Sequence, residues 1–401
     1  MRILISLPIK NPYHESIDSI LEGSEGCSGT DGSFIRVAKL LKDYGEDIVL
    51  SAETQIKSTH FACIDHRKVN PEHFDVIVAH QSHWNNGILS FGNTNLTKTY
   101  LWLHNQTSWM FVHSFLEGGG KQIICPSIYH ANIYRALPKW KQGVKVIYNP
   151  YCQIFAEDIY EPQNQLLFSG AITPHKGFDK LMHMWSHLIA SGVDLKLTIT
   201  GGIDLHKGGY VTTGRLGVAE AEFEAKFIVP WLNSLPEKYR PRFTGILSPS
   251  ELCHEINNSL AVIVNPACDH PETFCVAAVE AQACNRSVFS VVAGGLTETV
   301  YQGKRLTLSK DCNPTALAKL IVESLSSANL LKENGKLAGQ YVRSKFSDEA
   351  ILGLWLLLLS NQSTTSKLPI RWSSSRDLIC DLLRWSKTGV LFAKYLLNRS
   401  S

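Results

Sequence analysis

NPACDHPETFCVAAVEA, residues 265–281, is the part of this sequence from which its architecture can be worked out. It follows the apolar run Leu260–Val264, which predicts a buried strand, and it begins as a proline-bounded loop. From Phe274 to Cys284 the residues are short, apolar or small, which predicts a buried helix. A strand, a loop and the start of a helix therefore follow one another directly.

Two carboxylates, Glu272 and Glu280, lie on either side of the point where the loop becomes the helix. The free N–H groups and the dipole of a first helical turn favour an anion by about 0.3 to 1 kcal/mol. A carboxylate is a poor phosphate ligand but a good acceptor for sugar hydroxyls. The pair suggests a phosphorylated sugar along the start of the helix, although two ordinary glutamates on a helix fit the spacing equally well.

Short β-rich runs alternate with helix-length segments along most of the chain, and this alternation predicts doubly wound parallel sheets in an α/β protein. The polar segment Tyr151–Gln165, which follows Lys145–Pro150, is interpreted as a crossing between two similar halves. Two such halves imply a cleft whose ligands contact loops from both. The expected strands are 3–7, 47–52, 75–79, 99–103 and 122–125 in the first half, and 165–169, 195–200, 242–245, 260–264, 287–291 and 305–308 in the second.

Two glycine-containing loops are candidates for contact with a ligand. Gly29 and Gly32 precede the amphipathic helix expected over Phe34–Tyr44, at the carboxyl end of the first strand, where open α/β sheets bind ligands. After the strand 165–169 comes a loop from Gly170 to a Lys176-Gly pair, followed by a helix over 178–190. The lysine is a mobile charge that can reach a diphosphate, but on this segment alone an ordinary surface lysine is the favoured interpretation.

Composition limits the class of protein. With 401 residues, 44% apolar and 19% charged, the chain is expected to be a folded soluble protein of two domains. The net charge of +3 does not call for nucleic acid. Ten cysteines lie scattered without a metal-binding spacing, so reduced structural thiols are expected rather than disulfides. The first apolar run is too short for a signal peptide, and the longest, 351–359, is shorter than the roughly 20 residues of a membrane span, so we expect a cytoplasmic protein.

The C-terminal part has a different character. Ser347–Ser360 predicts a strongly apolar helix that packs against protein, and the Ser/Thr-rich 361–367 reads as a linker. Over 376–399 we expect an amphipathic helix, and from 370 onward six basic against two acidic residues leave a charge of +4. Such a helix can lie on an anionic membrane at the inner face. An accessory helix packed on the protein body is equally consistent.

Taken together, these landmarks resemble the family 4 retaining glycosyltransferases of the GT-B superfamily. The resemblance is carried by Gly170 to Gly177, Pro266, the Glu272 and Glu280 pair, and two further segments, Phe243-Thr-Gly245 and Gly294-Gly-Leu-Thr-Glu298. They occur in the family's order and at about its spacing over 165–300, and the first half matches more loosely. The resemblance implies two facing Rossmann-like domains, 1–150 and 151–345, then a helix over 346–361 returning toward the first domain and a tail over 362–401.

The resemblance also implies roles for individual residues. Lys176 would hold the donor diphosphate, and Glu272 would accept hydroxyls of the transferred sugar, with His104 near that sugar. Glu280 would accept the ribose hydroxyls. The expected catalytic residues are Glu272, His104 and Lys176, and the expected donor-binding residues are Gly29, Gly170, Lys176, Ile246, Phe274, Cys275 and Glu280.

The expected reaction transfers a hexose-type unit from a UDP- or GDP-type sugar to a glycan or lipid-linked acceptor, without a metal and with retention implied by the family. It would serve surface polysaccharide or glycolipid synthesis. Acceptor contacts are expected in 9–26 and 80–92, including His83 and Trp84.

One departure from the family leaves an alternative open. Ala171 stands where the family has an arginine, and Thr273 and Cys275 replace small glycines. Losing a guanidinium removes a strong partner of the diphosphate. A non-catalytic GT-B module that binds a nucleotide or scaffolds an assembly is therefore the alternative. A dinucleotide-dependent oxidoreductase is disfavoured because neither loop reads Gly-x-Gly-x-x-Gly.

Overall fold

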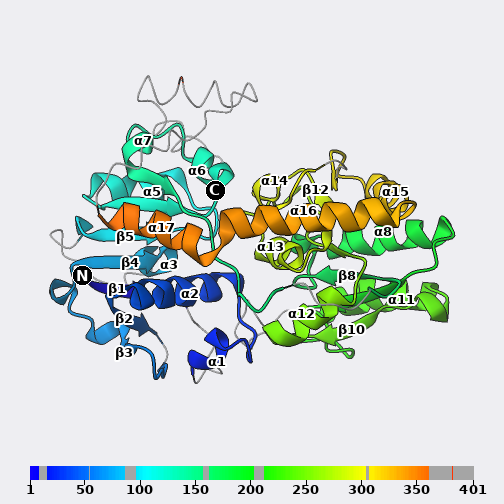
Figure 1. Cartoon of the computed structure of the whole chain (residues 1–401), viewed down its shortest axis with the longest axis horizontal. Coiled ribbons are helices and arrows are strands. Elements are labelled where there is room, and N and C mark those ends of the chain that lie inside the picture. Colours follow the sequence, from blue (N-terminus) through cyan, green and yellow to red (C-terminus); the bar gives the residue numbers. More distant parts are fainter. Residues whose placement is uncertain are drawn as a thin grey trace. The chain divides into compact units, whose positions relative to one another are not determined.

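A computed structural model describes residues 1–8, 16–53, 55–85, 96–156, 162–202, 212–303, 307–360 and 382. The chain forms two compact units. The first contains 1–17, 33–149 and the segment from 348 onward, and the second contains 18–32 and 150–347 (Figure 1). The expected basic helix over 376–399, apart from residue 382, and the parts 9–15 and 86–92 of the expected acceptor segments lie outside the described residues.

The first unit is built on a parallel sheet whose described strands follow the order β3-β2-β1-β4-β5-β6-β7 (Figure 1). Ile3 in β1 is paired with Ile48 in β2 and Val76 in β4, so both neighbours of β1 are fixed in register. The strands are β1 Arg2–Ser6, β2 Asp47–Ala52, β3 Ala62–Asp65, β4 Val76–His80, β5 Thr99–Trp102, β6 Gln122–Cys125 and β7 Val144–Val146.

Helices cover this sheet because its central strands are apolar on both faces; β4, for example, is buried along its whole length. The apolar helix expected at 347–360 forms as α17, Asp348–Leu359, and belongs to the first unit. Its Trp355 packs edge-on against Trp102 of β5, with ring centroids 5.0 Å apart. The other helices are α2 Gly29–Tyr44, whose residues up to Gly32 belong to the second unit, η1 His66–Lys68, η2 Pro71–His73, α3 Gln81–Asn85, α5 Trp109–Glu117, α6 Ile128–Ile133 and α7 Trp140–Gly143.

The second unit repeats the plan with a parallel sheet whose described strands follow the order β10-β9-β8-β11-β12-β13. Val262 in β11 is paired with Leu167 in β8 and Val288 in β12. The strands are β8 Gln165–Ser169, β9 Lys196–Thr200, β10 Arg242–Gly245, β11 Ala261–Ile263, β12 Ser287–Val291 and β13 Leu308–Ser309.

A core of buried side chains from β8, β9 and β11 and from α8 and α15 holds this unit together. Trp185 of α8 lies in that core and donates its indole N–H to the Tyr239 carbonyl at 2.9 Å. The helices are α1 Asp18–Leu21, η3 Pro174–Lys176, α8 Phe178–Ala190, α10 Ala221–Phe223, η4 Glu224–Ile228, α11 Val229–Ser234, η5 Glu237–Tyr239, α12 Pro249–Asn257, α13 Val276–Ala283, α14 Leu296–Thr299, α15 Pro314–Leu325 and α16 Ala328–Phe346.

The structure confirms the predicted doubly wound parallel sheets, and it corrects three details. The strands β3 and β7 were not predicted, and β7 ends inside the stretch Lys145–Pro150 that precedes the predicted crossing between halves. Gly29 and Gly32 lie in the first turns of α2 instead of in a loop, because Ser28 and Asp31 cap the helix start with reciprocal hydrogen bonds at 2.8 and 3.1 Å. The third correction concerns the cysteines and is described with the site. No helix in the described part of the chain is long and apolar enough to cross a membrane.

Candidate functional site

The candidate site lies where the strand order of the second sheet reverses. Starting from β8, the chain adds β9 and β10 on one side and β11, β12 and β13 on the other. The loops that leave β8 and β11 therefore diverge at the carboxyl edge of the sheet, and such a switch point is where open α/β sheets bind ligands. Lys176 lies on the loop after β8 and Glu272 on the loop after β11.

The two loops are joined by their charged side chains. Lys176 Nζ donates to Glu272 Oε1 at 2.5 Å, and Asn265 Nδ2 donates to the same oxygen at 2.9 Å. The Lys176 side chain is 31% exposed and that of Glu272 is 14% exposed, so the pair is shielded but open to a ligand. Two residues that the sequence places 96 positions apart thus form one polar centre.

Gly177 allows the two loops to approach. Its φ of +69° is left-handed, and a Cβ there would meet the Ala267 amide nitrogen at 2.8 Å and Pro266 Cδ at 2.9 Å. A side chain at this position would push the lysine loop away from the glutamate loop. In the pair Lys176-Gly177, the lysine therefore supplies the charge, and the glycine allows the close backbone contact that positions it.

Gly294 and Gly295 support the backbone of Glu272. Gly294 has a φ of +54°, and a Cβ there would lie 2.4 Å from the Glu272 carbonyl oxygen. The amide of Gly295 donates to that same carbonyl at 2.7 Å. The Gly294-Gly295 pair quoted for the family resemblance thus holds the backbone of the carboxylate.

Asn265 is a site residue that sequence reasoning missed, although it opens the stretch from which the architecture was inferred. It is 3% exposed and has a φ of +26°, which is unusual for a residue other than glycine. Its carbonyl accepts from Ser290 Oγ at 2.9 Å while its amide holds Glu272, so the turn and the carboxylate are fixed together. Asparagine is enriched at positive φ, and this enrichment is the signal that could have found it.

The start of α13 provides amide groups next to this pair. Cys275 is its N-cap residue and makes no side-chain capping hydrogen bond. Phe274 is buried against Phe346, with ring centroids 5.5 Å apart, and this contact fixes the approach to the helix. A Cβ on Gly29 would meet Val276 Cγ2 at 3.2 Å, so Gly29 lies directly beside the first residue of α13.

Burial and charge set the protonation of the groups at this helix start. Burial by itself would lower the pKa of the Lys176 ammonium, but the charge of Glu272 and its hydrogen bond outweigh burial, and the pKa is raised from 10.5. Lys176 is therefore a permanent cation. Burial, reinforced by the charge of Glu272, raises the pKa of the Cys275 thiol to about 12, so Cys275 is a neutral thiol.

A row of glycines continues the carboxyl edge from β8 to β10. The Gly170 amide donates to Thr200, and the Gly201 amide donates to Gly245 at 2.9 Å. A Cβ on Gly201 would lie 2.1 Å from the Gly170 carbonyl oxygen, so no side chain fits there. Ile246 follows this row and is 42% exposed. Sequence reasoning selected Gly170 and Ile246 and missed Gly201, which packs between their strands.

Ala171 remains the main departure from the family pattern. It is 8% exposed and lies directly after Gly170, so it supplies no charge to the site. The rings of His175 and His270 meet at 4.2 Å, and each is on one of the two loops that carry Lys176 and Glu272. Glu280 lies in the second turn of α13 and is partly exposed.

His104 belongs to the first unit, where it follows β5. It is 6% exposed, and its ring packs against Trp102 at 4.8 Å and Phe34 at 5.3 Å. Its backbone N–H donates to Gln81 Oε1 at 3.1 Å. Burial, with smaller contributions from His80 and His130, lowers the pKa of His104 well below its ordinary range, so the imidazole is neutral.

A disulfide bond corrects the expectation of reduced thiols. Cys268, on the Glu272 loop, is bonded to Cys312, which follows β13, with Cα atoms 5.9 Å apart. The two cysteines are 44 residues apart and share no local motif, so their pairing depends on the order of the strands and was not visible in the sequence. Among the described residues, no group of three His, Cys, Asp or Glu side chains is placed to hold a metal ion.

Comparison with known proteins relates the segment that carries this site to a family. Residues 153–340 match the family described as Glycosyl transferases group 1. No match to a curated protein sequence was found. The matched segment spans both loops of the candidate site and the glycines that support them.

Solved structures of similar fold cover 90% of the chain. Sucrose-phosphate synthase (tll1590) from Thermosynechococcus elongatus is similar with a TM-score of 0.67 and 17% identity, over 98% of that chain. Alr3699/HepE of Anabaena in complex with UDP has a TM-score of 0.65 and 14% identity over 100% of its length. Its complex with UDP-glucose has a TM-score of 0.63 and 15% identity over 99%.

At these identities the structural likeness shows the fold, and the family match assigns the class of enzyme. The two parallel sheets match the fold of these proteins, and the chain also has the C-terminal helix α17. The chain has the GT-B fold of these glycosyltransferases, and its residues 153–340 match the family of group 1 glycosyl transferases.

Proposed function

We propose that this enzyme transfers a sugar from a UDP- or GDP-type sugar to a hydroxyl acceptor with retention of configuration at the anomeric carbon, as in family 4. The observation that carries the proposal is the Lys176–Glu272 pair at the switch point, beside the start of α13. A cation and the amides of a helix start suit a diphosphate, and a carboxylate suits sugar hydroxyls. Alr3699/HepE of Anabaena, which has a similar fold, is seen in complex with UDP and with UDP-glucose, and this supports a nucleotide sugar as donor.

Donor binding would exchange the partners of the ion pair. Lys176 would turn from Glu272 to the diphosphate, and Glu272 would then accept hydroxyls of the sugar while Asn265 keeps its carboxylate oriented. Phe274 and Cys275 would offer backbone amides to the diphosphate, and Gly29 and Gly170 would leave room for it. Glu280 would accept the ribose hydroxyls, with the backbone at Ile246 beside the base.

In the reaction, the bond between the anomeric carbon and the diphosphate oxygen breaks as the acceptor oxygen bonds to the same face of that carbon. The acceptor proton passes to a phosphate oxygen of the leaving nucleotide. Lys176 and the amides of α13 would stabilise the charge that develops on the diphosphate, so the proposal requires no metal. His104, as a neutral imidazole, would lie near the transferred sugar.

The finer parts of the proposal concern the acceptor. We propose a glycan or lipid-linked hydroxyl, in surface polysaccharide or glycolipid synthesis. The first unit would bind it through residues near His83, whose Nδ1 lies 2.6 Å from Ser6 Oγ at the end of β1. A cytoplasmic location stays a prediction.

The test begins with a screen of UDP- and GDP-sugars for slow hydrolysis and then measures transfer from the best donor. Lys176→Ala and Glu272→Gln should each lower turnover by about 100-fold to 1,000-fold, the effect of removing one preorganised group at a developing charge. Lys180→Ala is the matched control, because Lys180 lies one turn further along, pairs with Asp179 at 3.2 Å and is outside the site.

Unchanged turnover in both site variants would refute the assignment. Donor binding with neither hydrolysis nor transfer by the wild type would favour the non-catalytic module that Ala171 suggests. The anomeric configuration of the product, measured by NMR, tests retention separately.

A further inference from the structure

The opposite edge of the second sheet carries a basic pocket that the proposed reaction does not use. It has a volume of about 470 Å³, within the range of small-molecule sites. Gln165, Lys196 and Arg242 are the first residues of β8, β9 and β10, so the pocket lies at the amino edge of the sheet. The five residues of β8 separate it from Gly170 by roughly 15 Å.

Four cations line this pocket, namely Lys196, Lys238, Arg240 and Arg242, against the carboxylate of Glu255. Its lining therefore has a net charge of +3, which equals the net charge of the whole chain. Lys196 and Arg240 are exposed and form no ion pair with any residue that the structure describes. Uncompensated cations in a concave surface attract anions more strongly than the same charges on a flat face.

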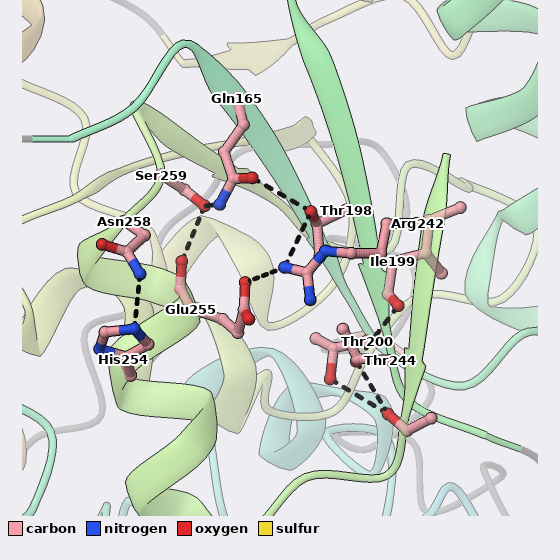
Figure 2. A network of polar contacts seen from close by, with 11 residues as sticks. Gln165, Thr198, Ile199, Thr200, Arg242, Thr244, His254, Glu255, Asn258 and Ser259 are labelled. Carbon is pink, nitrogen blue, oxygen red and sulfur yellow. Dashed lines mark hydrogen bonds and ion pairs between the residues drawn. The ribbon is translucent and has the colours of Figure 1, made fainter. Parts of the chain in front are cut away.

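One nitrogen of the Arg242 guanidinium is held by hydrogen bonds, and the other two are available to a ligand. Its Nη2 donates to Glu255 Oε2 at 2.5 Å and to Thr198 Oγ1 at 3.4 Å, as Figure 2 shows. In the described part of the chain no hydrogen bond uses its Nε or Nη1, and its side chain is 56% exposed. A guanidinium held in this way offers preorganised donors to a phosphate or carboxylate.

Next to Arg242 lies a chain of neutral polar groups, also seen in Figure 2. Thr198 Oγ1 donates to Gln165 Oε1 at 3.1 Å, and Gln165 Nε2 donates to Ser259 Oγ at 3.1 Å. Gln165 and Thr198 are buried, so these bonds fix the floor of the pocket. A membrane surface needs no such floor, whereas a small ligand with hydroxyl groups can use the Glu255 carboxylate and the amides of Gln163 and Asn258.

We infer that this pocket binds a small phosphorylated sugar, with its phosphate on Lys196, Arg240 and Arg242 and its hydroxyls toward Glu255 and the neutral groups of the lining. The carboxylate is the reason for choosing a phosphorylated sugar over a bare polyanion, because it repels additional charge and accepts hydroxyl hydrogen bonds. This site is separate from the donor site and does not depend on the proposed reaction.

The experiment titrates the full chain, saturated with UDP, with glucose 6-phosphate, inorganic phosphate and glucose, and follows binding by calorimetry. Binding of glucose 6-phosphate tighter than that of either other probe is expected. The double variant Lys196→Ala/Arg240→Ala should weaken it by about tenfold or more, because two charge-assisted contacts are lost. Both side chains are exposed, so an unchanged thermal midpoint will show that the fold is kept.

The matched control is Lys319→Ala/Lys336→Ala, which removes the same charge from α15 and α16 of the same unit, outside the pocket. An equal loss of affinity in this control would show unspecific attraction and overturn the site. If Lys176→Ala abolished the binding of glucose 6-phosphate while the pocket variant kept it, the ligand would lie in the donor site. That result would also overturn the proposal. Binding to phosphatidylglycerol vesicles in place of the soluble sugar phosphate, with the same dependence on Lys196 and Arg240, would assign the pocket to a lipid surface instead.

Discussion

At the scale of single residues, the protonation of Lys176 leads to a test of its role. Its pKa is raised because the charge and hydrogen bond of Glu272 outweigh the effect of burial, so the ammonium stays protonated as the pH rises through the physiological range. If this charge holds the diphosphate, the affinity for UDP should stay constant from about pH 7.5 to about pH 8.5, where UDP itself does not change its protonation.

Calorimetric titration of UDP across this range checks the expectation, with Lys176→Gln as the uncharged reference. A decline in wild-type affinity over this range, absent from the variant, would mean that the lysine loses its proton early. It would then be unable to act as the permanent cation of the site.

Gly294 gives a test of the backbone support below Glu272. A Cβ there would lie 2.4 Å from the Glu272 carbonyl oxygen, so Gly294→Ala should displace the loop and weaken UDP binding and turnover. It should also lower the free energy of unfolding by more than about 1 kcal/mol, because the left-handed φ is unfavourable for alanine.

Gly217→Ala is the matched control, because Gly217 has a similar φ of +71° with nothing within 4 Å of an added Cβ. It should cost about 1 kcal/mol of stability and leave UDP affinity unchanged. Equal effects of the two substitutions on affinity would show that strain, and not the contact with Glu272, explains the loss.

Some residues of the candidate site could be predicted from the sequence, and others could not. Lys176 and Glu272 were identified because charged side chains stood out against glycines and apolar runs. Asn265 and Gly201 were missed because their roles depend on backbone contacts, with a positive φ at both and the approach of Gly201 to Gly170. Such contacts link residues of different strands, and a single sequence carries no direct sign of them.

At the scale of elements, the buried strands were predictable, and so was the edge strand β10, whereas the two edge strands of the first sheet were not. The central strands β8 and β12 coincide with the predicted ranges because both faces are buried and the sequence is continuously apolar or small. β3 and β7 lie at the edges of the first sheet and are partly exposed, so they read as ordinary polar loop. The start of α2 was not predicted because glycines are unfavourable inside a helix, although Ser28 and Asp31 cap this one.

The disulfide joins the ends of two elements and gives a stability prediction. Cys312→Ser releases the 44-residue connection between the loops after β11 and β13. The free energy of unfolding should fall by about 2 to 4 kcal/mol, because the denatured chain gains freedom. Chemical denaturation with and without a reductant measures this loss, and the reductant should act on the wild type alone.

Cys63→Ser, at a partly exposed thiol of β3, is the control and should leave stability unchanged. If neither the reductant nor Cys312→Ser alters the denaturation curve, the bond contributes nothing in solution. The original expectation of reduced thiols would then hold for this pair.

At the scale of the whole molecule, the same plan appears in both units, with each sheet reversing its strand order beside its first strand. The alternation of strands and helices made this plan predictable, because each period leaves its own apolar pattern. The basic pocket was not predictable, because Lys196, Arg240 and Glu255 come together only through the order of β8, β9 and β10.

The tail from 370 to 401 lies almost entirely outside the described residues, and its function stays a prediction from charge and composition. Six basic against two acidic residues, with Trp385, Phe392 and Tyr395, predict binding to anionic membranes. Each basic residue near such a surface contributes about 1 kcal/mol, and salt weakens the attraction. Phosphatidylglycerol vesicles should therefore sediment the full chain at low ionic strength and release it at high ionic strength, while phosphatidylcholine vesicles should not bind it. A chain ending at residue 369 should lose this binding and keep its affinity for UDP; equal sedimentation of the two chains would rule out the tail as the membrane contact.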